Sequence, residues 1–372
     1  MQNVVFRVDA SLQIGSGHVM RCLTLAERLR SRENADILFI TRDLEGNLID
    51  LIREKGYSVA VLSRADHSGS EPLTGYGVWL TVTQKEDAQE TVAVLQKRSI
   101  CQDLIVDSYA IDQLWEREIR PYVNRIVVID DLANRIHDCD ILLDQNFYLD
   151  KEHRYKGLVP SSCHCFLGPQ YALLREEFYT LQKTLRVRTG ALENVLVFYG
   201  GSDLTDETSK ALSAIAQSGL QAYVHVIVGH RNPHREKIRR FCETHTGMSY
   251  HCQIDNIGTY MCLADVSFGA GGTTTWERCF LGLPTLVTAV ADNQIKICED
   301  CDRAGYIRFL GTADKVTKEQ LVHVLYEIQG KHVLKQMQEK CRLDVSQDHE
   351  NRTTLPSSCG IERCLAPISL AE

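Results

Sequence analysis

Short apolar segments alternate with amphipathic segments along the first half of the chain. The apolar runs predict buried strands, and polar or small residues after each run lead into helical patterns. The predicted strands are Val4–Val8, Asp36–Arg42, Val59–Leu62, Asp103–Val106, Arg125–Ile129 and Asp140–Leu143. The predicted helices are Val19–Arg32, Gly46–Lys55, Asp87–Gln96 and Leu114–Arg120. This alternation indicates a doubly wound parallel sheet.

The same alternation resumes after the polar stretch Lys183–Glu193. The predicted strands here are Val195–Tyr199, Tyr223–Val228, Asp265–Phe268 and Thr285–Val290, with helices from about Thr205 and over Thr317–Leu334. Because 372 residues are many for a single core, we expect two Rossmann-like α/β domains. These are residues 1–182 and 183–345, followed by a polar tail, residues 346–372, for which no structure is predicted.

Glycine-rich turns follow three of the predicted strands. The first has Gly15, Ser16, Gly17 and His18 at its crest, the second is Gly200-Gly201-Ser202, and the third contains Gly269, Gly271 and Gly272. Backbone amides at such turns can bind an anionic group, and ligands on these sheets bind beyond the carboxyl ends of strands. The first and third turns, facing each other across a cleft, would hold a diphosphate. His18, the only titratable side chain at the first crest, would then border the reacting bond.

Composition excludes several classes of partner. The hydrophobic content of 44% and the charged content of 24% are ordinary for a globular protein. The net charge of −8 argues against a nucleic-acid surface, although a small anionic ligand responds only to local charge. No apolar run approaches the roughly 20 residues of a membrane span, and no signal-peptide pattern precedes the first strand. We therefore expect a cytoplasmic protein without nucleic-acid or membrane partners.

The fourteen cysteines raise the possibilities of disulfides and of zinc. Many lie within apolar segments, where cysteine acts as a small hydrophobic residue, and thiols stay free in a reducing compartment. The pairs Cys163/Cys165 and Cys298/Cys301 lack partners at a recognisable zinc spacing. Asp138-Cys139-Asp140 resembles a metal-binding Asp-x-Asp motif, but it leads directly into an apolar run and favours a strand-edge role. We expect no metal and no cofactor.

One ordered series of motifs resembles a known family. Its members are Arg7–Ser11, Ile14–Cys22, Trp79-Leu80, Asp107–Tyr109, Ile129–Ala133, Asp144–Asn146, Gly168–Arg175, Gly200–Asp203, Gly269–Glu277 and Asn293-Gln294. The series resembles the hydrolases of the pseudaminic acid pathway, which cleave UDP from UDP-2,4-diacetamido-2,4,6-trideoxy-β-L-altropyranose. The resemblance runs to about Leu343 and implies the GT-B architecture, in which two parallel-sheet domains face a cleft. It fails in the tail, where the family's Asp-Gly-x-Gly stretch is absent.

The chemistry of such a hydrolysis indicates roles for residues of the first domain. UDP leaves as a weakly basic anion, so the main demands are a base for water and positive potential at the diphosphate. His18 suits the base because imidazole titrates near neutrality, and the resemblance implies the same role. Asp9 either orients His18 or the water, or caps the turn; Arg21 pairs with Asp9 or with a phosphate. By resemblance, Tyr109 contacts the sugar near the scissile bond.

The remaining candidate residues would bind the UDP-sugar, the only partner that we expect. Gly271, Gly272 and Thr273 suit the diphosphate, and Glu277 suits the ribose hydroxyls. Asn293 and Gln294 carry amides that suit acetamido or hydroxyl groups of the sugar. Gly200, Gly201 and Ser202 would contact phosphate or uridine, and Gly15, Ser16 and Gly17 would contact the substrate beside His18.

Two other functions fit the same architecture. One is a glycosyltransferase that uses a UDP-N-acetylhexosamine donor and passes the sugar to an acceptor instead of water. Transferases that act on lipid carriers usually carry a basic, apolar membrane patch, and no such run is present. The other is a nucleotide-sugar sensor, which would bind UDP without turnover.

Overall fold

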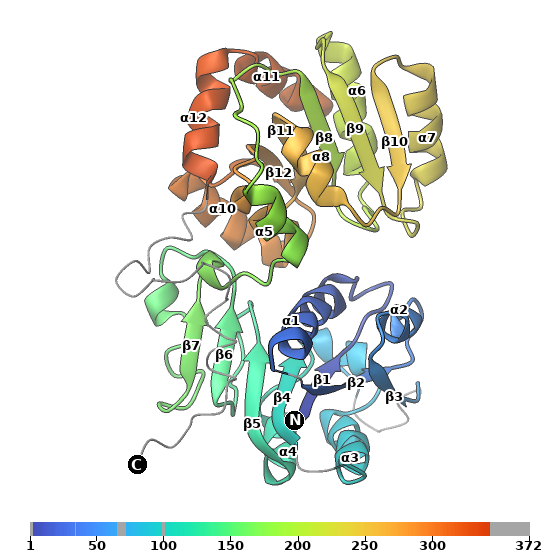
Figure 1. Cartoon of the computed structure of the whole chain (residues 1–372), viewed down its shortest axis with the longest axis vertical. Coiled ribbons are helices and arrows are strands. Elements are labelled where there is room, and N and C mark those ends of the chain that lie inside the picture. Colours follow the sequence, from blue (N-terminus) through green and yellow to red (C-terminus); the bar gives the residue numbers. More distant parts are fainter. Residues whose placement is uncertain (1–2, 34, 65–71, 99–100, 343–372) are drawn as a thin grey trace. The chain divides into compact units, whose positions relative to one another are not determined.

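The computed structural model describes residues 3–33, 35–64, 72–98 and 101–342. These residues form two compact units (Figure 1), the first comprising residues 3–146 and 150–173 and the second residues 147–149 and 174–342. Helix α5 (Glu176–Gln182) is therefore part of the second unit, whereas the sequence analysis placed it in the first domain. The predicted tail, residues 346–372, lies outside the described residues.

The first unit is built on a seven-stranded parallel sheet with the order β3-β2-β1-β4-β5-β6-β7. Its strands are β1 (Asn3–Val8), β2 (Asp36–Arg42), β3 (Ser58–Leu62), β4 (Cys101–Asp107), β5 (Val123–Ile129), β6 (Ile141–Asp144) and β7 (His164–Leu167). Its α-helices are α1 (Gly17–Glu33), α2 (Ile49–Glu54), α3 (Gln84–Leu95) and α4 (Gln113–Ile119). Short 3₁₀ helices are η1 (Gly75–Leu80), η2 (Arg120–Tyr122), η3 (Lys151–His153) and η4 (Pro169–Tyr171).

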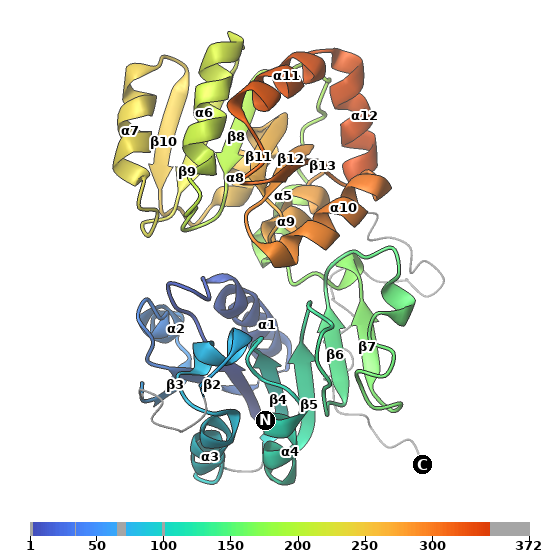
Figure 2. The same ribbon diagram turned by 180° about the vertical axis from the view of Figure 1, so that it is seen from behind.

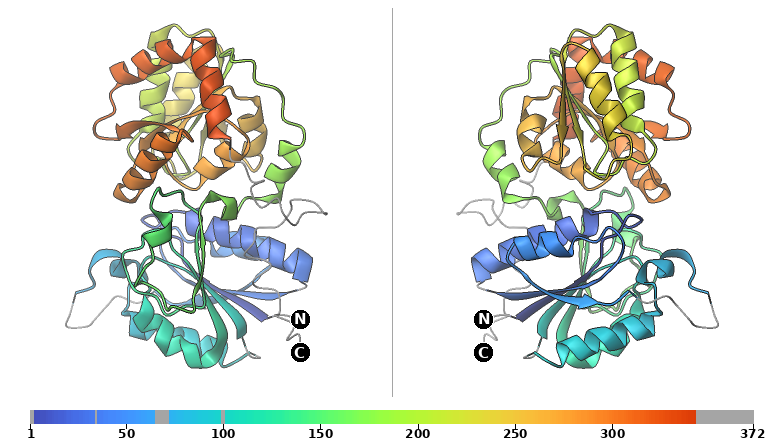
Figure 3. Two further views of the ribbon diagram at one scale, coloured as in Figure 1. Left: turned by 90° about the vertical axis from the view of Figure 1, so that its left-hand side faces the viewer. Right: turned by 90° about the vertical axis from the view of Figure 1, so that its right-hand side faces the viewer.

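Helices cover both faces of this sheet. Alternate residues of each strand point to opposite faces, and the apolar side chains on each face pack against helices. Phe6 and Val8 of β1 pack in the cluster that includes α1 and α2, whereas Val5 packs in the cluster that includes α3 and α4. Figure 3 shows α1 on one side of the sheet and α3 and α4 on the other. Since both faces are buried, the strands are near-continuous apolar runs rather than alternating ones.

The second unit has a six-stranded parallel sheet with the order β10-β9-β8-β11-β12-β13. Its strands are β8 (Asn194–Phe198), β9 (Tyr223–Val228), β10 (Met248–Cys252), β11 (Val266–Ala270), β12 (Thr285–Ala289) and β13 (Arg308–Thr312). After α5, its helices are α6 (Glu207–Ser218), α7 (Arg235–Thr244), α8 (Ile257–Leu263), α9 (Thr274–Phe280), η5 (Asp292–Gln294), α10 (Ile295–Ala304), α11 (Lys318–Ile328) and α12 (Lys331–Cys341).

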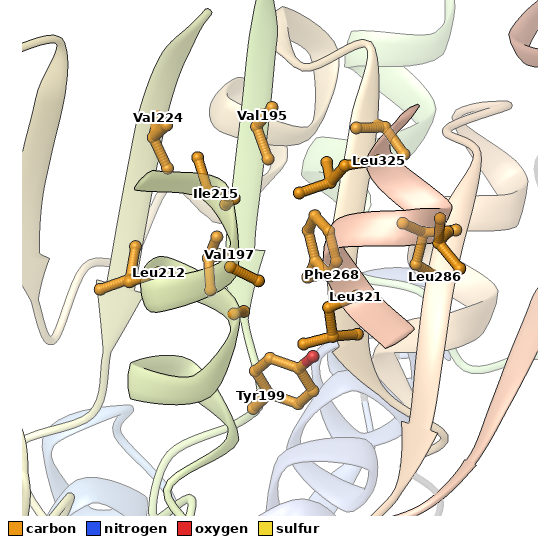
Figure 4. Packing of buried hydrophobic residues seen from close by; sticks show 14 of the residues in the cluster. Val195, Val197, Tyr199, Leu212, Ile215, Val224, Phe268, Leu286, Leu321 and Leu325 are labelled. Carbon is orange, nitrogen blue, oxygen red and sulfur yellow. The ribbon is translucent and has the colours of Figure 1, made fainter. Parts of the chain in front are cut away.

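The core of the second unit lies between this sheet and the helices α6 and α11, which are adjacent in Figure 2. Figure 4 shows Leu212 and Ile215 of α6 and Leu321 of α11 pointing at the strand residues Val197 and Phe268. All five side chains are almost completely buried, so the central strands β8 and β11 are held firmly. Their carboxyl ends, where two of the glycine-rich turns begin, are thereby fixed in place.

The long predicted helix Thr317–Leu334 is two helices in the structure, α11 and α12, which are separated at Gln329 and Gly330. Glycine disfavours a helix interior. Several strands and helices are not predicted from the sequence, namely β7, β10, β13, α5, α7, α8 and α10. The parallel sheets themselves are confirmed.

Candidate functional site

His18 lies in the first turn of α1, directly after the glycine-rich turn that follows β1. Gly15 turns the chain with a φ of +80°, a conformation that favours glycine. The imidazole is nearly buried, and its Nδ1 lies 2.6 Å from Oδ1 of Asp107. Nε2 has no hydrogen-bond partner among the described residues. A proton on Nδ1, shared with the carboxylate, leaves the Nε2 lone pair able to accept a proton.

Asp107 reaches His18 because β4 is paired with β1, with Val8 opposite Asp107 in the register. Arg21, one turn after His18 on α1, binds the same carboxylate twice, with Nε 2.5 Å from Oδ2 and Nη2 2.6 Å from Oδ1. Burial raises the pKa of Asp107, but Arg21 and then His18 outweigh burial and hold this pKa below its ordinary value. Asp107 is therefore a fixed, ionised partner of the imidazole.

Tyr109 follows β4 and packs its ring edge-on to the His18 ring, with centroids 4.7 Å apart. Its hydroxyl donates a hydrogen bond to Asp131, which also accepts one from Arg21 Nη1 at 3.0 Å. Burial and the neighbouring Asp131 raise the pKa of Tyr109 well above its ordinary value, so the phenol stays neutral. Trp79 stacks on Tyr109 at 5.6 Å and also meets the His18 ring edge-on at 6.4 Å. The imidazole thus sits against an aromatic wall.

Behind Asp131 lies a second acidic group, Asp144, at the end of β6. Its Oδ2 accepts hydrogen bonds from Arg154 Nε and from the Tyr155 hydroxyl, both at 3.0 Å. Burial and Asp131 raise the pKa of Asp144 to about 7, although Arg154 opposes them. The carboxylates Asp107, Asp131 and Asp144 had no assigned roles in the sequence analysis, since they appear there only within the motifs of the resemblance.

Asp9 does not contact His18. Its Oδ1 lies 2.7 Å from Arg7 Nη1 and accepts a hydrogen bond from the backbone amide of Arg42 at 2.7 Å. Arg7 and Arg42 also bind the buried Asp87, so Asp9 is part of a separate buried ion-pair network. The carboxylate beside His18 is Asp107, and Arg21 pairs with Asp107 and Asp131 rather than with Asp9.

The turn before His18 is held by its own backbone. Ser11 and Gly15 form an isolated bridge, and the Ser11 hydroxyl accepts from the amide of Ile14 at 3.0 Å. The carbonyl of Ser16 accepts from the amide of Met20, which starts α1. No heavy atom lies within 4 Å of the position that a Cβ of Gly17 would take, so the backbone there is open to a ligand.

In the second unit, Gly200-Gly201-Ser202 follows β8 and leads to α6. Asp203, next in the chain, accepts hydrogen bonds from the amides of Glu207 and Thr208, the first two residues of α6, both at 3.0 Å. It lies three residues before the N-cap position, Asp206, whose side chain makes no capping hydrogen bond. The Ser202 side chain makes no hydrogen bond to the described residues. The Asp203 carboxylate is therefore engaged by the start of α6, whereas Gly200, Gly201 and Ser202 remain available to contact a ligand.

Gly271, Gly272 and Thr273 connect β11 to α9. Gly269, in contrast, lies within β11, where a Cβ would come 1.8 Å from Nη1 of Arg278. A Cβ on Gly271 would come 2.3 Å from Cys298 Sγ, whereas one on Gly272 would meet nothing within 4 Å. Gly269 and Gly271 therefore allow close packing inside the unit, whereas Gly272 leaves its backbone open.

Glu277 lies on α9, the helix that follows this loop, and Asn293 and Gln294 lie in η5. Glu277 Oε1 lies 3.4 Å from Arg175 Nη2, its Oε2 is buried without a hydrogen-bond partner, and burial raises the pKa of the carboxyl. Gln294 accepts from the amide of Val290, and Asn293 is exposed. Glu277 Oε2 is a free acceptor of the kind that a hydroxyl ligand would satisfy.

Residues 3–33, 35–64, 72–98 and 101–342 contain no group of three or more histidine, cysteine or carboxylate side chains that could hold a metal ion. Arg120 binds both Asp138 and Asp140, which agrees with a strand-edge role for these carboxylates. The cysteines of the described part are free thiols. No helix in that part is long and apolar enough to span a membrane.

Comparison with known proteins gives distant relatives. No family model matches the chain. It is 29% identical over 258 residues to the UDP-2,4-diacetamido-2,4,6-trideoxy-β-L-altropyranose hydrolase of Campylobacter jejuni, covering 69% of this chain and 81% of the relative. It is 24% identical over 338 residues to the spore coat polysaccharide biosynthesis protein SpsG of Bacillus subtilis, covering 88% and 89%.

Solved structures establish the fold. MurG of Acinetobacter baumannii is 11% identical with a TM-score of 0.60, covering 92% of this chain and 95% of MurG. LpCGTa, solved in complex with UDP, is 12% identical with a TM-score of 0.60, covering 91% and 94%. The protein has the GT-B fold. The architecture expected from the sequence is confirmed, and the chain is distantly homologous to a UDP-sugar hydrolase.

Proposed function

We propose that this protein hydrolyses a UDP-linked acetamido sugar to UDP and the free sugar. The proposed substrate is UDP-2,4-diacetamido-2,4,6-trideoxy-β-L-altropyranose, the substrate in the name of the Campylobacter jejuni relative. The observation that carries the proposal is the His18–Asp107 pair, in which a carboxylate holds Nδ1 and Nε2 has no partner among the residues that the structure describes. Such a pair is a general base for water.

In the proposed reaction, Nε2 of His18 removes a proton from water as the water oxygen bonds to the anomeric carbon. The bond between that carbon and the diphosphate oxygen breaks, and UDP leaves with the electron pair. The imidazolium that forms is stabilised by Asp107, whose negative charge is shared with Arg21. Because UDP is a weakly basic leaving group, the reaction needs little general-acid help, unlike ordinary glycoside hydrolysis with its two carboxylates.

The second unit would bind the nucleotide. Backbone amides of Gly271, Gly272 and Thr273 are the proposed donors to the diphosphate, and Glu277 is the proposed acceptor from the ribose. The open backbone at Gly272 and the unpartnered Oε2 of Glu277 support these assignments. Gly200, Gly201 and Ser202 would contact the uridine side of the ligand, and Asn293 and Gln294 the sugar.

Gly15, Ser16, Gly17 and Tyr109 are proposed to contact the sugar beside His18. The neutral Tyr109 phenol is tied to Asp131 and its ring supports the imidazole. We propose that it positions the sugar while Arg21 fixes Asp107. Asp9 is not proposed for proton transfer, since its carboxylate is engaged by Arg7 and by the backbone of Arg42.

The test is to incubate the protein with a panel of UDP-acetamido sugars in the presence of a metal chelator and to follow UDP and free sugar by chromatography. The proposal requires equimolar UDP and free sugar without any acceptor. His18→Ala should still bind UDP but lose about 10²–10⁴-fold in turnover. Release of UDP only with an acceptor would identify a transferase. Tight UDP binding without turnover, unchanged by His18→Ala, would identify a sensor.

A further inference from the structure

A buried arginine without a counter-ion lies beside the Gly271–Thr273 loop. Arg278, on α9, is 1% exposed. Its Nη2 donates to the carbonyl of Ala270 at 2.7 Å and to the Thr275 hydroxyl at 3.1 Å. Its Nε and Nη1 have no hydrogen-bond partner, and it forms no ion pair with any residue that the structure describes.

Three other buried arginines of this protein are paired with carboxylates. Arg7 binds Asp9 and Asp87, Arg42 binds Asp87, and Arg21 binds Asp107; Arg7 and Arg42 are as deeply buried as Arg278, and Arg21 is nearly so. Burial lowers the pKa of Arg278, but a guanidinium stays protonated in proteins. A buried charge is normally compensated by a partner. Among the described residues Arg278 therefore has no ion-pair partner, and the Glu277 carboxyl acts on its charge without forming an ion pair.

The residues around Arg278 leave space for its guanidinium group and place polar groups beside it. Gly269 has no Cβ, and a Cβ there would come 1.8 Å from Arg278 Nη1. The hydroxyls of Tyr199, which follows β8, and Thr288, on β12, are buried and interact with each other, and Tyr199 also lies within electrostatic reach of Arg278. β8 and β12 are the two strands that flank β11. Buried polar groups from three neighbouring elements thus gather toward the carboxyl ends of the central strands, where ligands bind on such sheets.

We propose that the missing counter-ion of Arg278 is the diphosphate of the bound nucleotide. This inference rests on the proposed function and assigns a further residue to its nucleotide site. Arg278 does not touch the ligand in this proposal, because its nitrogen atoms are covered by protein. It is a positioning residue: through Ala270 it fixes the backbone that enters the Gly271–Thr273 loop, and its charge acts across that loop in a medium of low dielectric constant.

The inference predicts selectivity for charge. Arg278 should favour ligands in proportion to their phosphate charge and contribute little to binding of the uncharged nucleoside. A purely structural arginine would instead support the loop equally for UDP and for uridine. The ratio of the two affinities therefore separates an electrostatic role from a packing role.

The experiment is isothermal titration calorimetry of UDP, UMP and uridine with the full chain and with Arg278→Met, Arg278→Gln and Arg278→Lys. We expect Arg278→Met and Arg278→Gln to weaken UDP about 10–100-fold, to weaken UMP less, and to change uridine less than about twofold. Arg278→Lys, which keeps the charge, should restore most of the UDP affinity. Arg239→Met is the matched control, because it removes the same charge from an exposed position on α7 and should change neither affinity.

Equal loss of UDP and uridine affinity, or an unchanged UDP affinity in Arg278→Gln, would overturn the inference. If Arg278→Met fails to fold, as judged by its thermal transition, Arg278→Gln and Arg278→Lys still make the comparison. Turnover of the unmodified protein, measured on the same preparation, tests the proposed function separately. If the protein binds UDP but releases none from any substrate, the proposed hydrolase function is wrong and the inference about Arg278 stands. If the protein does not bind UDP, both are wrong.

Discussion

At the scale of single residues, the candidate site depends on a contact between side chains that are 89 residues apart, His18 and Asp107. The position of His18 after a glycine turn is a local feature and was predicted. The identity of its partner depends on which strand lies next to β1, and that strand is β4. Asp9 is closer to His18 in the sequence, but its carboxylate binds Arg7 and the backbone amide of Arg42.

Replacement of Asp107 tests this pairing. Asp107→Asn removes the charge that stabilises the imidazolium and disturbs the Nδ1 tautomer, so kcat should fall about 10²–10⁴-fold with a small change in KM. The measurement is steady-state UDP release. Because Arg21 would lose its main partner, the thermal transition should be measured in parallel to confirm that the variant is folded.

Asp9→Asn is the comparison variant. It weakens the network of Arg7, Arg42 and Asp87, so we expect its main effect on the free energy of unfolding, by about 1–3 kcal/mol. Urea unfolding gives this value. A fall in kcat as large as that of Asp107→Asn, in a variant of unchanged stability, would return Asp9 to the catalytic site.

Asp144 predicts a dependence of stability on pH. Burial and Asp131 raise its pKa to about 7, whereas an unfolded aspartate titrates near about 4. Between these values the folded chain holds a proton that the unfolded chain has lost. Its free energy of unfolding should therefore fall as the pH rises through this window, by at most about 1.4 kcal/mol per pH unit.

The check is urea unfolding of the protein and of Asp144→Asn at pH 5, 6, 7 and 8. The variant has no titrating group at this position, so its stability should fall less between pH 5 and 7 than that of the parent. Arg154 loses a partner in the variant, which lowers the free energy of unfolding by a roughly constant amount at each pH. The change of this free energy with pH is therefore the quantity to compare. Parallel curves for the two proteins would contradict the assigned titration.

At the scale of elements, one turn can serve both a helix and a ligand. Asp203 binds the first two amides of α6, those of Glu207 and Thr208, whereas Ser202 makes no side-chain hydrogen bond to the described residues. The sequence predicts a ligand-binding turn that leads into a helix at about Thr205. In the structure, Asp203 binds the start of the helix, and the Ser202 side chain is not engaged by it.

This division predicts opposite phenotypes for neighbouring substitutions. Asp203→Ala should lower the free energy of unfolding by about 0.5–2 kcal/mol, because the first two amides of α6 lose their acceptor. Ser202→Ala should leave stability unchanged and weaken UDP binding if its hydroxyl contacts the ligand. Urea unfolding and calorimetry with UDP measure the two quantities. A stabilising or neutral Asp203→Ala would show that these hydrogen bonds do not stabilise the protein in solution.

Elements with continuous apolar runs were the ones that the sequence predicted well. β2 and β9 have the predicted bounds, because a strand buried on both faces needs apolar residues at every position. β10 and β13 lie at the two edges of their sheet and are only partly buried. Their sequences carry polar residues that an edge strand tolerates, so no continuous apolar run marks them.

At the scale of the whole molecule, the proposed function divides its tasks between the two units. His18, the proposed base, and its carboxylate partner belong to the first unit, and the proposed nucleotide loops belong to the second. UDP alone should therefore protect the second unit. At about 100 times its Kd, UDP should stabilise the state that binds it by about 2.7 kcal/mol.

Hydrogen exchange followed by mass spectrometry measures where this protection falls. We expect slower exchange in the segments that connect β8 to α6 and β11 to α9, and little change in the β-sheet of the first unit. His18→Ala is the control and should show the same pattern, because it is proposed to act on water and not on UDP. Protection confined to the segment between β1 and α1 would place the nucleotide in the other unit.

The sequence by itself determined the parallel α/β architecture and the positions of the glycine turns, because burial on both sheet faces and backbone turns leave local patterns. It also placed a histidine at the crest of the first turn. The packing of the strands and helices shows that Asp107 holds this histidine, that Asp9 belongs to another network, and that Arg278 is buried without an ion-pair partner among the described residues. These facts depend on strand order and on which groups share a buried space, and neither is encoded in neighbouring residues.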